Sequence, residues 1–103
     1  MYERAIRTAP DHAPSYLYAG DACLALGRSE EGMEYYRSSA RLAPGNPLPW
    51  YRLGVALMRA KQWAEADSAL SRGRTLAEGN RRIQEMFDRA FQALWARASS
   101  ELP

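Results

Sequence analysis

The 103-residue sequence contains one cysteine, one histidine and one lysine, and these shortages exclude several classes of protein. A single cysteine excludes an intramolecular disulfide framework and a thiolate-rich metal site. With His12 as the one histidine, a metal centre or catalytic site built on imidazoles lacks ligands. No apolar run approaches the ~18 residues of a membrane span, and the first residues lack the pattern of a signal peptide. The sequence therefore predicts no direct membrane insertion.

The sequence also has little net charge. Lysine and arginine number 14 against 12 acidic residues, which gives +2 at pH 7. The longest basic run is Arg81-Arg82, so no clustered positive charge argues for a nucleic-acid partner. Hydrophobic residues at 47% and charged residues at 25% are typical of a folded globular domain. The strong excess of arginine over lysine indicates a GC-rich coding sequence, which fits a bacterial source.

No catalytic group or cofactor motif stands out in the sequence. A nucleophile needs a base within hydrogen-bond reach, and Cys23 and His12 fall on different predicted elements. We interpret Cys23 as a core residue and His12 as a turn residue. Glycine-rich phosphate loops and metal-ligand spacings are missing as well. We therefore expect no enzymatic activity, no cofactor and no metal.

The sequence repeats itself with a period of 34 residues. Pro10 and Pro44 are separated by this period, and both follow similar helical endings and precede polar turns. Four further pairs share the spacing: Tyr16 and Trp50, Gly20 and Gly54, Leu42 and Leu76, Asn46 and Asn80. A fixed period in this range is typical of helical repeat proteins.

The period and its residues resemble the tetratricopeptide repeat family, whose pattern runs Trp-x2-Leu-Gly-x2-Tyr, then Ala-x3-Phe, then Pro. Residues 47–80 match at Trp50, Leu53, Gly54, Leu57, Ala66 and Leu70, with Leu57 replacing the aromatic and Glu78 the closing proline. Residues 13–46 match more loosely at Tyr16, Ala19, Gly20, Cys23, Gly32, Tyr36, Ser39 and Pro44. Residues 1–12 resemble the second half of a repeat, with Tyr2, Ala5 and Pro10 in place.

The resemblance implies an all-α fold, a helix-turn-helix solenoid in one domain over residues 1–103. We predict a half repeat at 1–12, full repeats at 13–46 and 47–80, and a C-terminal capping helix at 81–98. A start halfway through a repeat indicates a fragment of a longer protein, the alternative being a natural half-repeat start. Both a cytoplasmic and a periplasmic location fit, and we leave the compartment open.

The residues themselves predict six helices, at 1–8, 14–27, 30–43, 48–60, 64–77 and 81–98. Pro14 suits a first helical turn, Gly27 a helix end and Ser29 an N-cap followed by acidic residues. The capping helix has a continuous apolar face, and we expect the tail from Ser99 to Pro103 to be frayed. Small residues that let helices approach closely are Gly20, Gly32, Ser39, Gly54, Ala66 and Gly73.

In the family the first helix of each repeat lines a concave groove that binds peptides. Carried onto this chain, the lining positions are Leu17, Asp21 and Leu24 in one repeat and Leu48, Tyr51, Val55, Met58 and Arg59 in the next, with Arg82 and Arg89 from the capping helix. A helix that is apolar on two faces is either buried all round or faces a partner, so internal packing is the alternative. The arginines favour a ligand with apolar anchors and an acidic residue, unless they form only a solvated surface.

One subclass of the family grips the C-terminal carboxylate of chaperone peptides with lysine and asparagine. The matching positions here hold Leu17, Asp21, Leu48 and Arg52. Three of these side chains cannot donate to a carboxylate, and Asp21 would repel one. We therefore predict that the chain does not recognise such tails.

Trp95 continues the apolar face of the last predicted helix. It either closes the core against helix 64–77 or is exposed and contacts a second copy or the rest of a parent protein. The sequence thus predicts a module that binds a protein or peptide, within a larger scaffold or adaptor. The alternatives are self-assembly through the terminal helices, which includes a homodimer, and a regulatory domain of a larger enzyme.

Overall fold

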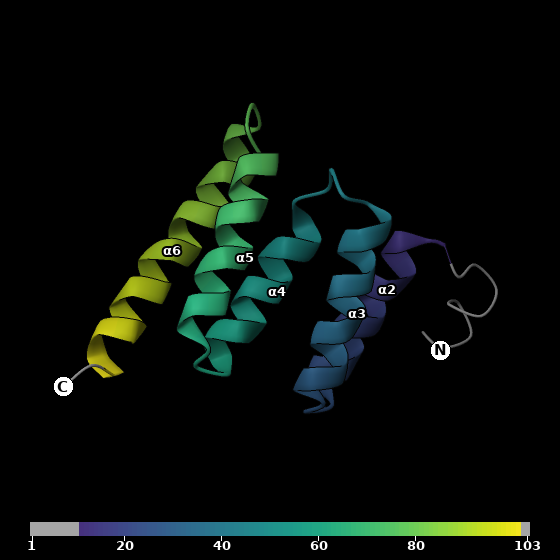
Figure 1. Cartoon of the computed structure of the whole chain (residues 1–103), viewed down its shortest axis with the longest axis horizontal. Coiled ribbons are helices and arrows are strands. Elements are labelled where there is room, and N and C mark those ends of the chain that lie inside the picture. Colours follow the sequence, from purple (N-terminus) through teal and green to yellow (C-terminus); the bar gives the residue numbers. More distant parts are fainter. Residues whose placement is uncertain (1–10, 102–103) are drawn as a thin grey trace. The chain divides into compact units, whose positions relative to one another are not determined.

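The computed structural model describes residues 11–101, and this part of the chain contains five helices and no strand (Figure 1). The helices are α2 (Ala13–Ala25), α3 (Ser29–Leu42), α4 (Leu48–Arg59), α5 (Trp63–Leu76) and α6 (Arg81–Glu101). The all-α prediction is confirmed, and each boundary from α2 to α5 agrees within two residues. The helix predicted at 1–8 lies outside the described residues. No helix between residues 11 and 101 has the length and apolar character to cross a membrane.

The chain divides into two compact units that meet between Gly45 and Asn46. The first unit contains α2 and α3, and the second contains α4, α5 and α6. This division falls within one residue of the repeat boundary that the sequence pattern predicts.

The α2–α3 hairpin of the first unit turns on Gly27, which has a φ of +79°. The Arg28 N–H donates to the Cys23 carbonyl at 2.8 Å, and the Gly27 N–H donates to the Leu24 carbonyl at 3.1 Å. These two bonds form a Schellman motif, in which glycine is favoured because it has no Cβ to strain the left-handed conformation. The predicted role of Gly27 is confirmed.

Two glycines bring α2 and α3 close together. A Cβ placed on Gly20 would lie 2.5 Å from Tyr36 Cε1 and 2.9 Å from the Gly32 carbonyl oxygen. The core of this unit is made of buried side chains on both helices: Leu17, Ala19, Cys23, Met33, Tyr36 and Ala40. The buried Ser39 hydroxyl donates to the Ala13 carbonyl at 2.9 Å, so this polar group is satisfied across the pair.

The prediction that Ser29 caps α3 is wrong. Arg28 occupies the N-cap position, and Ser29 is the first helical residue. The reason is the short turn, because the carbonyl of Arg28 already accepts the first helical bond from Gly32 at 3.0 Å. Glu30 and Glu31 do lie in the first turn, where the helix dipole favours them.

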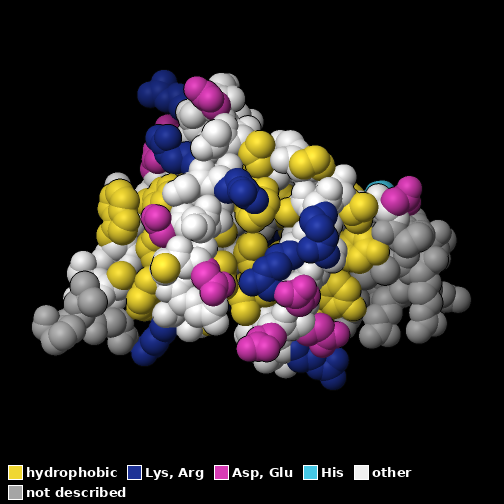
Figure 2. Space-filling model, viewed as in Figure 1, with side chains coloured by type: hydrophobic (Ala, Val, Ile, Leu, Met, Phe, Trp, Pro, Cys, Tyr) yellow, Lys and Arg dark blue, Asp and Glu magenta, His cyan; other side chains and the backbone are white. Residues whose placement is uncertain are grey.

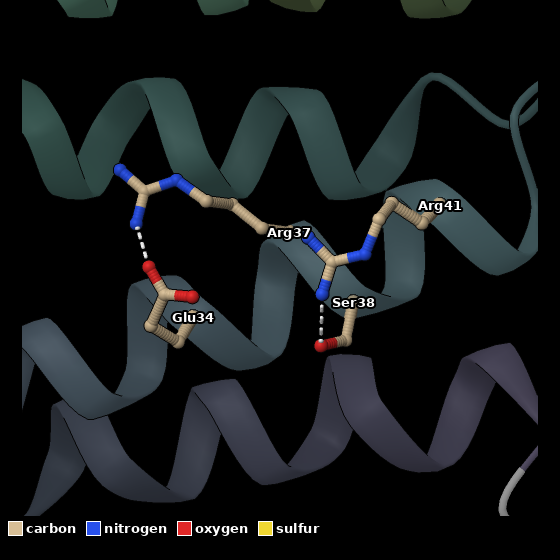
Figure 3. A network of polar contacts seen from close by, with 4 residues as sticks. All are labelled: Glu34, Arg37, Ser38 and Arg41. Atoms are coloured by element: carbon tan, nitrogen blue, oxygen red, sulfur yellow. Dashed lines mark hydrogen bonds and ion pairs between the residues drawn. The ribbon is translucent and has the colours of Figure 1, made fainter.

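Helix α3 carries two local polar pairs (Figure 3). Arg37 donates to Glu34 at 2.5 Å, and Arg41 donates to the Ser38 hydroxyl at 3.0 Å. Both pairs join residues three apart on one exposed helix face, and such pairs contribute little to stability.

In the second unit, α5 packs against both α4 and α6, and α4 also contacts α6. A Cβ on Gly54 would lie 2.5 Å from Leu70 Cδ2, so α4 approaches α5 at a glycine. A Cβ on Gly73 would overlap the Phe87 ring of α6 and would lie 2.8 Å from Trp50 Cβ of α4. The predicted roles of these small residues are therefore confirmed.

The α4–α5 turn has the geometry of the α2–α3 turn without its glycine. Lys61 follows Gly27 by one 34-residue period and has a φ of 61°. The Lys61 N–H donates to the Met58 carbonyl at 2.9 Å, and the Gln62 N–H donates to the Leu57 carbonyl at 2.9 Å. The same Schellman motif thus forms around a residue with a side chain, which costs energy in the left-handed region.

Helix α6 is longer than the sequence indicates. It begins at Arg81 as predicted but continues through Ser99 and Ser100 to Glu101. The Ser100 hydroxyl donates to the Arg97 carbonyl at 2.8 Å, and the first helix-breaking residue after Asn80 is Pro103. The prediction of a frayed tail is wrong for residues 99–101, and Leu102 and Pro103 lie outside the described part.

Candidate functional site

The predicted groove residues lie on both units, on α2 in the first and on α4 and α6 in the second. On α2, Leu17 is buried, whereas Asp21 and Leu24 are half-buried. The Tyr36 hydroxyl of α3 donates to Asp21 Oδ1 at 2.6 Å. This bond orients the Asp21 carboxylate and uses part of its capacity to accept hydrogen bonds.

In the second unit, α4 presents the apolar row that the sequence predicts. Leu48, Tyr51 and Val55 are half-buried, and they share one helix face because they are spaced by three and four residues. Met58 continues the row but is only 5% exposed. Met58 therefore belongs to the core, whereas the other three side chains are partly exposed.

The row on α4 meets α6 at an aromatic contact. Tyr51 and Phe87 have ring centroids 5.5 Å apart and planes at 85°, an edge-to-face arrangement. Phe87 is fully buried and so supports the half-buried Tyr51 ring from behind. The sequence pattern does not place Phe87 in the groove, although Phe87 lies one 34-residue period after Leu53.

Three exposed arginines belong to the same unit. Arg59 ends α4, and Arg82 and Arg89 are spaced seven residues apart on one face of α6. None of the three forms an ion pair within the described residues, whereas Arg81 pairs with Glu85 at 3.6 Å. Their guanidinium groups are therefore available for carboxylates of a partner.

Trp95 is 60% exposed, so it does not close the core as one interpretation held. Its ring lies 5.7 Å from that of Phe91 with the planes tilted by 34°. Both rings line a cleft of about 510 Å³ between α5 and α6. The exposed alternative is the one that the structure supports, while its use in self-association stays a prediction.

Cys23 and His12, the one cysteine and the one histidine of the sequence, both have positions that suit a structural role. Cys23 is buried in the first unit. His12 shares a hydrogen bond of 2.9 Å between its Nδ1 and the Ser15 hydroxyl, next to the start of α2. These positions fit the core and turn roles that the sequence predicts.

Comparison with protein families matches residues 14–56 to the tetratricopeptide repeat. The resemblance seen in the sequence is therefore confirmed, although the matched segment ends within α4. Comparison with the curated proteins gives no match.

Solved structures share the fold over nearly the whole chain. The Yersinia enterocolitica type III secretion chaperone SycD, in complex with a peptide of the translocator YopD, superposes with a TM-score of 0.86 at 18% identity, covering 98% of this chain and 77% of the chaperone. SycD in an alternative dimer gives a TM-score of 0.85 at 19% identity, with shares of 98% and 77%. The TPR2B domain of yeast Sti1, in complex with pHsp70, gives 0.81 at 24% identity, with shares of 98% and 79%. These likenesses establish a helical repeat fold of the tetratricopeptide type.

Proposed function

Because the chain contains a tetratricopeptide repeat, we propose that it is a protein-interaction module whose second unit binds a peptide or partner protein. The observation that carries the proposal is the half-buried row of Leu48, Tyr51 and Val55, which lies in the same unit as three unpaired arginines. SycD and the Sti1 domain, which share the fold, were solved in complexes with a YopD peptide and pHsp70. The fold thus supports peptide binding as a use for this surface.

The apolar row on α4 and the three arginines favour a ligand that has both apolar and acidic side chains. Apolar side chains of the partner would cover the row on α4, and an acidic side chain would meet Arg59, Arg82 or Arg89. Each apolar side chain contributes roughly 1.5–3 kcal/mol when fully covered, and the cost of association removes much of that. We therefore expect a dissociation constant in the micromolar range, which corresponds to a binding free energy of about 8 kcal/mol.

The test uses synthetic 15-residue peptides with two leucines and two glutamates, measured by fluorescence polarisation. The double reversal Arg59→Glu with Arg82→Glu should weaken binding about tenfold or more, because it replaces attraction by repulsion at two exposed sites. Arg41→Glu on α3 is the matched control and should bind as the original protein does. Equal affinity in all three proteins would remove the basic part of the proposal.

The apolar part needs its own variant. Tyr51→Ala removes the aromatic side chain from the row, and we expect at least a tenfold loss of affinity. Circular dichroism checks that the variant keeps its helices, since Tyr51 also contacts Phe87. A folded Tyr51→Ala protein with unchanged affinity would place the ligand elsewhere.

A self-assembly module is the second candidate, and the exposed Trp95 favours it. SycD, which shares the fold, was solved as an alternative dimer. Size-exclusion chromatography with light scattering over a hundredfold concentration range separates the two candidates. A dimer that Trp95→Ala abolishes would support self-assembly, whereas a monomer throughout would leave peptide binding.

We place such a module in a scaffold or adaptor, with a regulatory domain of a larger enzyme as the alternative. No acidic chaperone tail is expected as the ligand. The positions of the carboxylate clamp hold Leu17, Asp21, Leu48 and Arg52, and the Asp21 carboxylate accepts a hydrogen bond from Tyr36. Tight binding of a peptide with an acidic C-terminal tail at these positions would contradict this expectation.

A further inference from the structure

A cleft between α5 and α6 is separate from the apolar row on α4. It has a volume of about 510 Å³. Its walls come from one unit, with Asp67, Ser71 and Arg74 on α5 and Asp88, Phe91, Gln92 and Trp95 on α6. Figure 2 shows hydrophobic side chains at the surface over α6, on the left of the view.

The apolar part of this cleft is aromatic. Phe91 lines the cleft and is 9% exposed, whereas the neighbouring Trp95 ring is 60% exposed. Their ring centroids are 5.7 Å apart. The indole therefore has a packed neighbour that limits its movement and a large surface open to solvent, which suits stacking with a flat or cationic group.

The charged part of the cleft has one unbalanced carboxylate. Arg74 Nε donates to Asp88 Oδ1 at 2.7 Å, and this carboxylate raises the pKa of the Arg74 guanidinium through the hydrogen bond and its charge. The two charges of that pair cancel. Asp67 is exposed and forms no ion pair or hydrogen bond within residues 11–101. The charged side chains that line the cleft therefore leave one uncompensated negative charge, that of Asp67, although the chain carries +2.

The same unit shows how an arginine packs on tryptophan in this fold. The Arg72 guanidinium carbon lies 5.1 Å from the centroid of the Trp50 ring. Trp50 has a basic partner, whereas no arginine or lysine of the described residues is recorded over Trp95. Trp95 together with Asp67 therefore offers both elements that an incoming arginine needs, a ring face and an opposite charge.

We propose that the α5–α6 cleft binds a basic segment of another protein, which places an arginine against Trp95 with its charge compensated by Asp67 and an apolar neighbour on Phe91. Arginine suits the site better than lysine because its planar, weakly hydrated guanidinium stacks on an indole. An acidic segment is excluded because it meets Asp67 and has no unpaired cation in the cleft. This surface differs in charge from the proposed groove, so the module would hold two chemically opposite ligands.

The experiment uses the full chain and a 12-residue helical peptide with two arginines and two leucines on one face. A second peptide carries lysine, and a third glutamate, in place of both arginines. Binding is followed through the Trp95 indole cross-peak in ¹H–¹⁵N spectra, assigned by its loss in Trp95→Phe, and through fluorescence polarisation. We expect the arginine peptide to shift this peak, the lysine peptide to bind more weakly, and the glutamate peptide not to bind.

Substitutions in the cleft test whether the arginine peptide contacts Trp95 and Asp67. Trp95→Ala and Asp67→Asn should each weaken the arginine peptide about three- to fivefold, in line with exposed cation–π and ion-pair contacts. Glu65→Gln, a matched change of an exposed α5 acid outside the cleft, should leave affinity unchanged. Both side chains changed in the cleft are exposed, so the variants should keep the helical content of the original.

Three outcomes would overturn the proposal. Equal binding of the glutamate peptide would show that charge plays no part. Loss of arginine-peptide binding in Tyr51→Ala but not in Trp95→Ala would assign the peptide to the groove on α4. A dimer that disappears in Trp95→Ala, with no peptide bound, would make a second copy the occupant. Failure of the groove proposal would be distinguishable from these outcomes. It would appear as unchanged binding of acidic peptides in the groove variants, not in the arginine-peptide experiments.

Discussion

The Tyr36 hydroxyl of α3 donates a 2.6 Å hydrogen bond to Oδ1 of Asp21 on α2, across the closest approach of the two helices. The Tyr36 ring is also the group that a Cβ on Gly20 would meet. One side chain therefore contributes both to the packing of the first unit and to the orientation of a predicted groove residue. Its two roles can be separated by mutation.

Tyr36→Phe should lower the free energy of unfolding by about 1 to 2 kcal/mol, because a hydrogen bond to a carboxylate is lost while the ring stays in place. Urea denaturation followed by circular dichroism measures the change. Tyr18→Phe on α2 is the control, since Tyr18 is exposed, and it should change stability by less than about 0.5 kcal/mol. Equal effects of the two substitutions would mean that the bond to Asp21 contributes nothing.

Gly20→Ala should destabilise the chain by about 2 kcal/mol, although alanine is the better helix former by about 1 kcal/mol. The new methyl group meets the Tyr36 ring and the Gly32 carbonyl, and backbone atoms have no freedom to move aside. Gly45→Ala is the comparison, because a Cβ there meets nothing within 4 Å. Thermal unfolding of the two proteins should therefore differ, and a Gly20→Ala protein as stable as the original would refute the close approach.

Lys61→Gly should stabilise the chain by about 1 kcal/mol, since glycine removes the strain of a left-handed residue at the end of α4. Lys61→Ala separates this effect from loss of the lysine side chain, because alanine keeps the Cβ. The alanine variant should show no gain in urea denaturation. If both variants are equally stable, the gain has another origin.

Met58→Ala should lower stability by about 2 to 4 kcal/mol, as expected for truncation of a buried side chain. Arg59→Ala, the next residue along, is exposed and should change stability by less than about 0.5 kcal/mol. This contrast matters for binding studies, because a weaker ligand affinity in Met58→Ala would report a damaged core. A Met58→Ala protein of unchanged stability would place Met58 at the surface instead.

The sequence predicted the helices well where its signals were local. The 34-residue period located Gly20 and Gly54, the predicted close approaches also included Gly73, and the structure places a neighbouring helix against each of the three. Pro14 and Gly27 marked the limits of α2 because proline and glycine act through the backbone alone. The predicted apolar row on α4 is also present as a half-buried face.

Other features depended on partners distant in the sequence. The burial of Met58 could not be read from a row that also contains the half-buried Val55. Trp95 sits on the same apolar face as Phe91, yet only the packing of α5 against α6 decides which ring is covered. The length of α6 was underestimated because Ser99 and Ser100 are weak helix formers, although no glycine or proline interrupts the sequence between Asn80 and Pro103.

Gly73 of α5 lies where all three helices of the second unit meet. A Cβ at this position would overlap the Phe87 ring of α6 and crowd Trp50 of α4. Tyr51, the residue after Trp50, contacts the same Phe87 ring edge to face. Any side chain at position 73 would wedge α4 and α6 apart and widen the face that Tyr51 occupies. Gly73 would then affect how well a ligand fits the face around Tyr51 without contacting the ligand.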